Sequence, residues 1–239
     1  WFNRNPGLAL PLIALQYHEV KYNFELKTPL TNPKLLVNYV YLDTDERRRF
    51  AQVSHEYLIE QVQTQRSNLV QNLNSVILTF NHPVKALFWS LKNGDTAVAV
   101  DTTTVDTCLE LNGHERFKPQ DYKYFNLLQP YENGLGNSKL LNGRVWGNVL
   151  MAPSTLSADR TSVNSTSSIT KESASKKPGM YSFCLKPAEH QPSGSCNFSR
   201  IDNARFSLSA GGSGTLHMHA LNYNVLRIMS GMGGLTYSN

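Results

Sequence analysis

The chain has 239 residues, of which 40% are hydrophobic and 17% charged, and its 23 basic and 18 acidic residues give a net charge of +5. This mildly basic balance, without a run of five or six like charges, argues against a nucleic-acid-binding protein. The length suits one large all-β domain, or one domain and a piece of another. The low share of charged residues indicates that partners cover much of the surface.

The three cysteines, Cys108, Cys184 and Cys196, are too sparse and uneven in number for a disulfide scaffold. They predict buried free thiols in a reducing compartment. No apolar stretch reaches the length of about eighteen residues that a membrane span needs. The apolar run at 8–15 is short, broken by Pro11, and lacks the features of a signal peptide. Because the chain begins at a tryptophan rather than a methionine, we expect a fragment of a longer protein.

The first expected element is a half-buried strand over residues 17–26. Its apolar and polar side chains alternate, as they do on the two faces of a strand. Pro29 and Pro33 then interrupt the chain, because proline donates no ladder hydrogen bond. We therefore predict a boundary between a segment at 1–30 and a main domain at 31–239.

Residues 35–42 are apolar on both faces apart from Asn38, which predicts a central, buried strand. A short helix is expected next, because acidic residues at 43–46 precede the arginines at 47–49 and this order compensates the helix dipole. The three arginines point in different directions around a helix. They form either a solvated face or a contact between subunits.

The later strands are predicted from runs of apolar and β-branched residues separated by turns, with Asn93-Gly94 and Asn112-Gly113 as hairpin signals. Tyr122 to Leu128 is expected to be a short helix or an irregular arm. The segment 134–179, rich in Ser, Thr and Lys, is a protruding functional loop or a disordered insertion, and we expect 154–177 to be mobile. The predicted strands are 57–64, 76–80, 84–91, 96–100, 107–111, 180–185, 198–208 and 216–229.

The last strand has a change of phase. Its apolar side chains lie at 216, 218 and 220, and then at 221, 223 and 225. Such a change predicts a β-bulge, or a strand that leaves one sheet for another. The glycine-rich tail at 230–234 is expected not to continue a ladder, but to follow the surface with Met232 or Leu235 as anchors.

About eight strands, with tight turns and long excursions in alternation, favour an all-β, antiparallel, eight-stranded jelly-roll sandwich with short helices in long loops over an up-and-down barrel. His217 and His219 share one face of a strand and could chelate a metal as in cupins, yet no glutamate follows them. We interpret them as polar or interface residues. No phosphate-binding loop or nucleophile elbow is present, so we predict no catalytic residue, no cofactor and no metal. Sequons at Asn164 and Asn197 are candidate glycosylation sites, of which Asn164 is the more plausible.

Six stretches, covering about half of the chain, carry a resemblance to a known family. By these stretches the chain closely resembles the major capsid proteins of the nucleocytoplasmic large DNA viruses. They are WFNRNPGLALPLIALQYHEV (1–20), YLDTDERRRFAQVSHEYLIEQVQ (41–63), LNGHERF (111–117), YFNLLQPY (124–131), MYSFCLKPAEHQPSGSCNFSRIDNA (180–204) and NYNVLRIMSGMGGLTYSN (222–239).

The resemblance implies a double jelly roll, in which residues 1–30 hold the closing strand of a first jelly roll plus a linker and residues 31–239 form the C-terminal one. It implies a homotrimer that forms pseudo-hexagonal capsomers in the icosahedral shell of a virion. Neighbouring capsomers, minor capsid proteins and, indirectly, an internal viral membrane are the implied partners, with no direct nucleic acid and with assembly in the host cytoplasm. Two alternatives stay open: a carbohydrate-binding jelly-roll module with Tyr122, Tyr124 and Phe125 as a sugar platform, and a cupin-type metalloenzyme.

Overall fold

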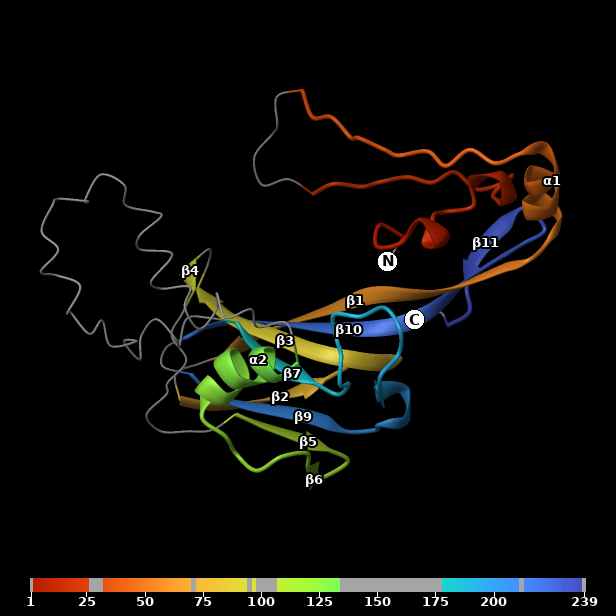
Figure 1. Ribbon diagram of the computed structural model, residues 1–239. Coiled ribbons are helices and arrows are strands. Elements are labelled where there is room, and N and C mark those ends of the chain that lie inside the picture. Colours follow the sequence, from red (N-terminus) through yellow and green to blue (C-terminus); the bar gives the residue numbers. More distant parts are fainter. Residues whose placement is uncertain are drawn as a thin grey trace, which may run out of the picture. The chain divides into compact units, whose positions relative to one another are not determined.

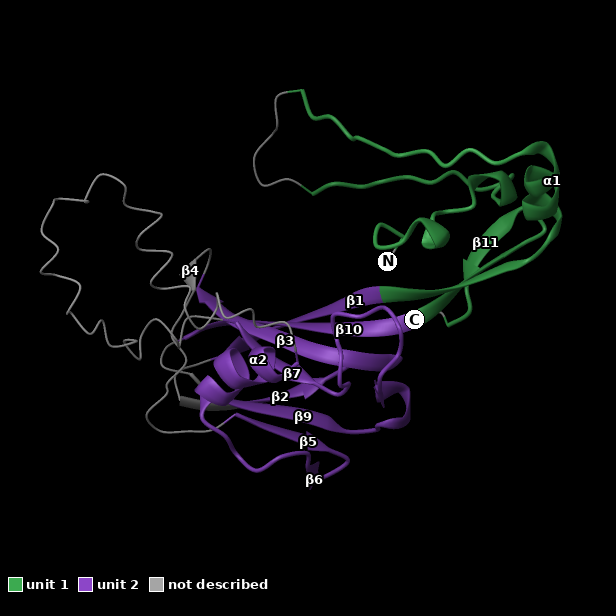
Figure 2. Cartoon of the chain, viewed as in Figure 1, with its two compact units in different colours: residues 1–60, 224–239 green, residues 61–223 purple. Residues whose placement is uncertain are grey.

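The computed structural model describes residues 2–25, 32–69, 72–93, 96–97, 107–133, 178–210 and 213–237. The chain divides into two compact units, residues 1–60 with 224–239, and residues 61–223 (Figure 2). We call them unit 1 and unit 2. Most of the predicted insertion, residues 134–177, lies outside the described residues. The mobility expected for residues 154–177 therefore stays a prediction. The expected boundary near residue 30 stays a prediction.

Two antiparallel sheets make up the β-structure (Figure 1). In the described part of the chain, the larger sheet has the strand order β1 (His55–Leu69), β10 (Gly214–Met229), β3 (Pro83–Asn93) and β4 (Thr96–Ala97). In the same sheet, β7 (Gly179–Ser182) and β8 (Cys196–Asn197) pair with β3, and β11 (Met232–Leu235) pairs with β10. The smaller sheet has the order β2 (Asn72–Leu78), β9 (Ala204–Ala210), β5 (Cys108–Leu111) and β6 (His114–Glu115).

The core of unit 2 lies between the two sheets, because the inward side chains of both are apolar. Trp89 of β3 is 1% exposed, and its ring centroid lies 4.9 Å from that of Phe206 on β9. Leu87, Leu208 and Met218 are buried beside them. Burying large aromatic and aliphatic side chains is the main stabilising contribution to such a core. The predicted all-β, antiparallel jelly-roll sandwich is confirmed.

The phase change in β10 corresponds to a real irregularity. β10 pairs with β3 in regular register up to Leu221↔Ala86, and the register shifts between Leu221 and Asn222. Leu216, Met218 and Ala220 are buried, as predicted, whereas Leu221 and Val225 are only half-buried and the polar Asn222 is fully buried. The bulge was therefore predicted correctly, but the side chains buried after it are partly polar.

Short helices complete the described structure. α1 (Thr44–Gln52) begins where expected, because Asp43 and Glu46 form a reciprocal capping box at its N-terminus. The predicted arm at 122–128 is helical: η3 (Tyr124–Leu128) continues into α2 (Gln129–Glu132), which contacts β7. Three further turns are η1 (Pro6–Leu8), η2 (Leu12–Ala14) and η6 (Phe198–Arg200). Among the described residues, no helix combines the length and apolar character needed to cross a bilayer.

Two tight hairpins follow the same rule of turn chemistry. Asn112 and Gly113, which join β5 to β6, have φ of 52° and 78°, and Ser230 and Gly231, which join β10 to β11, have φ of 53° and 80°. Positive φ at both central residues defines a two-residue turn that matches the twist of the flanking strands. The prediction that the glycine-rich tail ends the ladder was therefore wrong. β11 pairs with β10 because this turn fixes the register, and Met232 and Leu235 are about half exposed rather than anchored.

Two predicted strands are absent. Residues 17–25 and 35–42 are largely extended but belong to no ladder, and their side chains are mostly exposed. Leu36 is 92% and Tyr41 90% exposed, although 35–42 was predicted to be a buried central strand. The physical reason is that a strand needs a neighbour for its backbone hydrogen bonds and a second layer for its apolar face. Apart from one backbone hydrogen bond of Tyr17, the described residues supply no ladder partner and no covering layer for these two segments.

Candidate interaction surfaces

The two histidines of the His-x-His motif lie side by side on the outer face of the larger sheet. The inward residues of β10 are Leu216, Met218 and Ala220, so His217 and His219 point the other way. Thr64 of β1 lies 2.9 Å from His219, measured from Oγ1 to Nδ1, and Thr215 donates to Asn68 at 3.0 Å. These bonds set β1 in register with β10. Strand alternation then places the side chain of Arg66 on the same face.

The same face carries a lysine from β3. Register pairs Thr215 with Lys92 and His217 with Ser90, so β3 presents Ser90 and Lys92 beside the histidines. We call this set the cationic face. Its members are Thr64, Arg66, Asn68, Ser90, Lys92, Thr215, His217 and His219.

The electrostatics of the cationic face act against positive charge on its histidines. The pKa of His217 is lowered by partial burial and by the neighbouring charges of Arg66 and Lys92. The pKa of His219 is lowered by burial, Lys92 and Arg66, in that order. The same two cations would repel a bound metal ion. A metal site at this pair, and with it a cupin-type enzyme, has no support in the geometry.

The aromatic residues considered as a sugar platform do not form one. Tyr122 is 3% exposed and Phe125 is fully buried, with its ring centroid 5.4 Å from that of Trp89. Only Tyr124 is half-buried, and its hydroxyl accepts a hydrogen bond from Gln129 at 2.9 Å. A sugar platform needs ring faces open to solvent, so this prediction was wrong. The rings instead fill the core beside the sheets.

A buried lysine that sequence reasoning missed holds the loop after β7. Lys85 of β3 is 0% exposed, its Nζ donates to the carbonyl of Glu189 at 2.8 Å, and it lies 4.8 Å from the ring centroid of Tyr223. Phe183 also donates its backbone N–H to the carbonyl of Lys85 at 2.8 Å. Cation–π contact and a charge-assisted hydrogen bond together compensate the desolvated ammonium group. The side chain thus ties the loop to the sheet.

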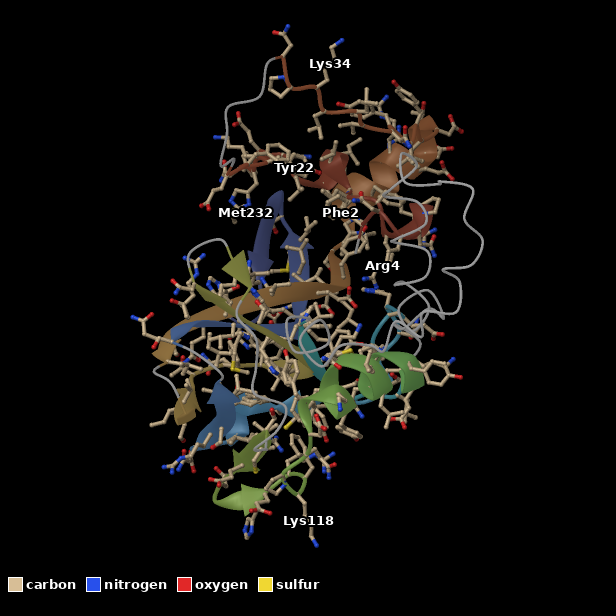
Figure 3. The ribbon with its side chains drawn as sticks, turned by 90° about the vertical axis from the view of Figure 1, so that its left-hand side faces the viewer. Phe2, Arg4, Tyr22, Lys34, Lys118 and Met232 are labelled. Atoms are coloured by element: carbon tan, nitrogen blue, oxygen red, sulfur yellow. The ribbon has the colours of Figure 1, made fainter. Side chains whose placement is uncertain are left out.

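Unit 1 exposes aromatic side chains along its extended segments. Tyr22 lies 6.4 Å from Phe2 and 6.5 Å from Phe24, measured between ring centroids (Figure 3). Tyr22 is 46% and Phe24 66% exposed. Contiguous exposed apolar surface of this kind marks a place where another protein surface binds. Exposed apolar side chains also occur at 35–41. We call residues 17–25 and 35–41 the apolar segments.

The two ends of unit 1 are held together by direct bonds. Tyr17 donates its N–H to the carbonyl of Gly231 at 3.0 Å, and Gly233 donates its N–H to Nδ1 of His18 at 2.9 Å. Arg4 adds an ion pair with Glu60 at 2.9 Å, and Glu60 keeps only 6% of its side chain exposed. We call the bonds between 17–18 and 231–233 the terminal clasp.

The remaining candidate residues are scattered. Asn164 lies outside the described residues, and Asn197 is exposed, with its Oδ1 accepting the N–H of Ser199 at 3.1 Å. Cys108 and Cys184 are buried and Cys196 is half-buried. None of the three forms a disulfide in the described structure, and burial raises the pKa of Cys196. Glycosylation at either sequon stays a prediction.

Comparison with known proteins decides the family. The model for "Large eukaryotic DNA virus major capsid protein" matches residues 46–137 and 161–234, and the model for "Major capsid protein N-terminus" matches residues 1–43. The chain belongs to this family of major capsid proteins. It is 49% identical over 253 residues to the major capsid protein of Pyramimonas orientalis virus and 35% identical over 320 residues to that of Paramecium bursaria Chlorella virus 1.

The structure of this chain is also similar to solved capsid protein structures. A quasi-atomic model of the PBCV-1 virus capsid matches the whole chain with a TM-score of 0.69 at 31% identity, over 69% of its own chain. The two relatives above are matched over the full length of this chain, which spans 60% and 65% of their lengths. The relatives that the chain matches are named as major capsid proteins, and the matching solved structure is named as a virus capsid model.

Proposed function

We propose that the chain is part of a homotrimeric capsid building block. Three copies form a pseudo-hexagonal capsomer, and capsomers tile the icosahedral shell of a large DNA virus after assembly in the host cytoplasm. Neighbouring capsomers and minor capsid proteins are its direct partners, and an internal membrane is an indirect one. Family membership supports this proposal, since a capsid shell needs many copies held by permanent interfaces.

The single observation that carries the proposal is the exposure of the apolar segments. Leu36 and Tyr41 are about nine-tenths exposed, and Tyr22 and Phe24 are about half to two-thirds exposed. Obligate assemblies bury large, mostly apolar surfaces of roughly 2,000–5,000 Å². A soluble monomer with these side chains uncovered would aggregate. The segments therefore fit a protein whose working state is an assembly.

We further propose that residues 1–30 complete a preceding jelly roll and that residues 31–239 form the C-terminal one. The apolar segments lie within the match to the capsid N-terminus model, residues 1–43. The relatives extend beyond the span of this chain, so they contain residues that could pair with residues 17–25. On pairing, 17–25 would gain the ladder partner that it lacks among the described residues.

Electron microscopy and light-scattering mass measurement of the full-length capsid protein test this proposal. We expect a particle of three times the monomer mass with a pseudo-hexagonal outline. Substituting Leu36 and Tyr41 by serine should lower the trimer fraction, whereas Leu185→Ser, a control at a 79% exposed loop position, should not. A monodisperse, stable monomer at high protein concentration would refute trimerisation.

A further inference from the structure

The cationic face is not explained by the sandwich or by the apolar segments. Arg66 and Lys92 are exposed, and neither forms an ion pair with any of the described residues. His217 and His219 lie between them across three adjacent strands. Among the described residues, no aspartate or glutamate is a member of the face.

Such an arrangement is unfavourable for the isolated protein. Protonation of either histidine would place like charges on neighbouring strands, which destabilises a sheet. The pKa of each histidine is lowered first by burial and then by these neighbouring cations. An anionic partner would turn the repulsion into attraction. Complementary charge of this kind sets partner choice and association rate at protein interfaces.

We propose that the cationic face binds an extended acidic protein segment whose carboxylates occur at alternate positions. Side chains two residues apart on a strand point the same way and lie about 7 Å apart, as His217 and His219 do, which matches alternate side chains of an extended ligand. Register places Arg66 level with His217, and Lys92 level with Thr215. These groups thus spread over three adjacent strands and more than one register level rather than surround one point, which fits an extended polyanion better than one compact oxyanion.

Binding to this face takes up protons. Burial and, after it, the neighbouring cations lower the pKa of both histidines in the free protein, so the rings are mostly neutral at neutral pH. Carboxylates placed beside the rings favour the charged form and oppose the effect of Arg66 and Lys92. The affinity for an acidic segment therefore rises as the pH falls from about 7.5 to about 6, within the range where histidine titrates.

Fluorescence anisotropy with a labelled peptide of alternating glutamate and threonine tests the proposal. We expect binding that strengthens on acidification, and weakening by about tenfold in the double variant R66Q/K92Q. The matched control R205Q/K118Q removes the same charge from exposed positions outside the face, where Figure 3 shows Lys118 projecting from the ribbon, and should change affinity less than about twofold. H217Q/H219Q should keep the affinity at about pH 7.5 and lose its pH dependence.

Several outcomes would overturn this inference. Equal weakening by both arginine–lysine double variants would show a general charge effect, and equal binding of a glutamine–threonine peptide would exclude carboxylate recognition. Full displacement by inorganic phosphate at the peptide's own concentration would show a simple oxyanion site instead. Circular dichroism of each variant verifies the fold. The face lies in unit 2, and the peptide assay needs no capsomer. Failure of the peptide to bind therefore leaves the trimer proposal standing, and failure of the chain to form trimers leaves the peptide-binding proposal standing.

Discussion

Gly231 occupies a backbone conformation and a space that a larger residue cannot share. Its φ is +80°, and a Cβ atom there would lie 2.7 Å from the ring of Tyr17. The residue thus serves both the hairpin turn between β10 and β11 and the terminal clasp, because its carbonyl accepts the N–H of Tyr17. Gly234, three residues later, has no atom within 4 Å of the same position.

We predict that Gly231→Ala destabilises unit 1 by about 1–3 kcal/mol, since the variant combines strain at positive φ with a steric clash. Hydrogen exchange should show lost protection at the amides of Tyr17 and Gly233, together with a lower melting temperature. Gly234→Ala is the matched control and should stay within about 0.5 kcal/mol of the wild type. Equal stability of the two variants would show that the clasp does not depend on this turn.

Lys85 contributes through two separable parts of its side chain. The apolar stem fills space in a fully buried site, and the ammonium group holds the carbonyl of Glu189. We predict that Lys85→Ala costs about 2–5 kcal/mol because it leaves a cavity, whereas Lys85→Met keeps the stem and costs less.

Both Lys85 variants should speed hydrogen exchange in the loop at 186–193, where the ammonium bond is lost. Urea unfolding measures the change in the free energy of global unfolding. Lys92→Met, on the exposed face of the same strand, is the control and should change stability by no more than about 0.5 kcal/mol. A loop that stays protected in Lys85→Met would show that the ammonium group does not anchor it.

The two histidines of the cationic face link stability to pH. Their pKa values are lower in the folded chain than in the unfolded chain, so the unfolded state binds more protons under mildly acidic conditions. The free energy of unfolding therefore decreases as the pH falls below the ordinary histidine pKa of about 6.5. We predict a flatter pH profile in urea for H217Q/H219Q, and an intermediate profile for R66Q/K92Q. Identical slopes in all three proteins would contradict this assignment.

At the scale of elements, two glutamine side chains of β1 form hydrogen bonds to backbone groups on or just after β2. Gln65 donates to the carbonyl of Ile77 at 2.7 Å and accepts the N–H of Thr79 at 3.0 Å. Gln63 repeats the pattern with the carbonyl and the N–H of Asn81 at 2.6 and 3.0 Å. Each amide thus satisfies backbone groups on or just after β2 and joins β1 of one sheet to β2 of the other.

We predict that Gln65→Leu destabilises unit 2 by about 0.5–1.5 kcal/mol, because it removes two hydrogen bonds to exposed backbone groups that water replaces in part. Gln65→Glu should also be destabilising, since it keeps the acceptor for Thr79 but faces the carbonyl of Ile77 with a second acceptor. Urea denaturation measures both, with Gln191→Leu in an exposed loop as the control. Unchanged stability in Gln65→Leu would mean that water replaces the amide at no cost.

The elements that the sequence predicted well are those fixed by local chemistry. The capping box at Asp43 and Glu46 fixes the start of α1, and Asn112-Gly113 fixes a hairpin turn, because few other residues adopt these conformations. The bulge near residue 221 was visible as a change in the alternation of β10. The His-x-His pair was correctly placed on one face.

The elements that the sequence missed depend on distant partners. Alternation in residues 17–25 shows that one face needs cover, but it does not show whether the covering strand is present. The role of Lys85 was hidden because its partners, the carbonyl of Glu189 and the ring of Tyr223, come from distant positions. The cationic face was likewise invisible, since register alone brings Arg66 and Lys92 beside the histidines.

At the scale of the whole molecule, the contrast between the two units governs solution behaviour. Unit 2 has a dense apolar core, whereas unit 1 displays the apolar segments. We predict that Leu36→Ser with Tyr41→Ser raises the solubility of the 239-residue chain, because it removes two of its most exposed apolar side chains. The melting temperature of unit 2 should stay unchanged. Light scattering measures the solubility, and calorimetry measures the melting temperature. Leu185→Ser is the control. An equal gain in solubility in this control would show that removing any exposed apolar side chain has the same effect.

The terminal clasp has a consequence for the order of events during synthesis. Tyr17 and His18 bind groups of Gly231 and Gly233, which are more than 200 positions later in the chain. A ribosome releases the N-terminal part of a protein first, at about 5–20 residues per second, so this partner arrives last. The clasp therefore closes only after residues 231–233 have been synthesised and released, and shorter nascent chains carry the apolar segments without it.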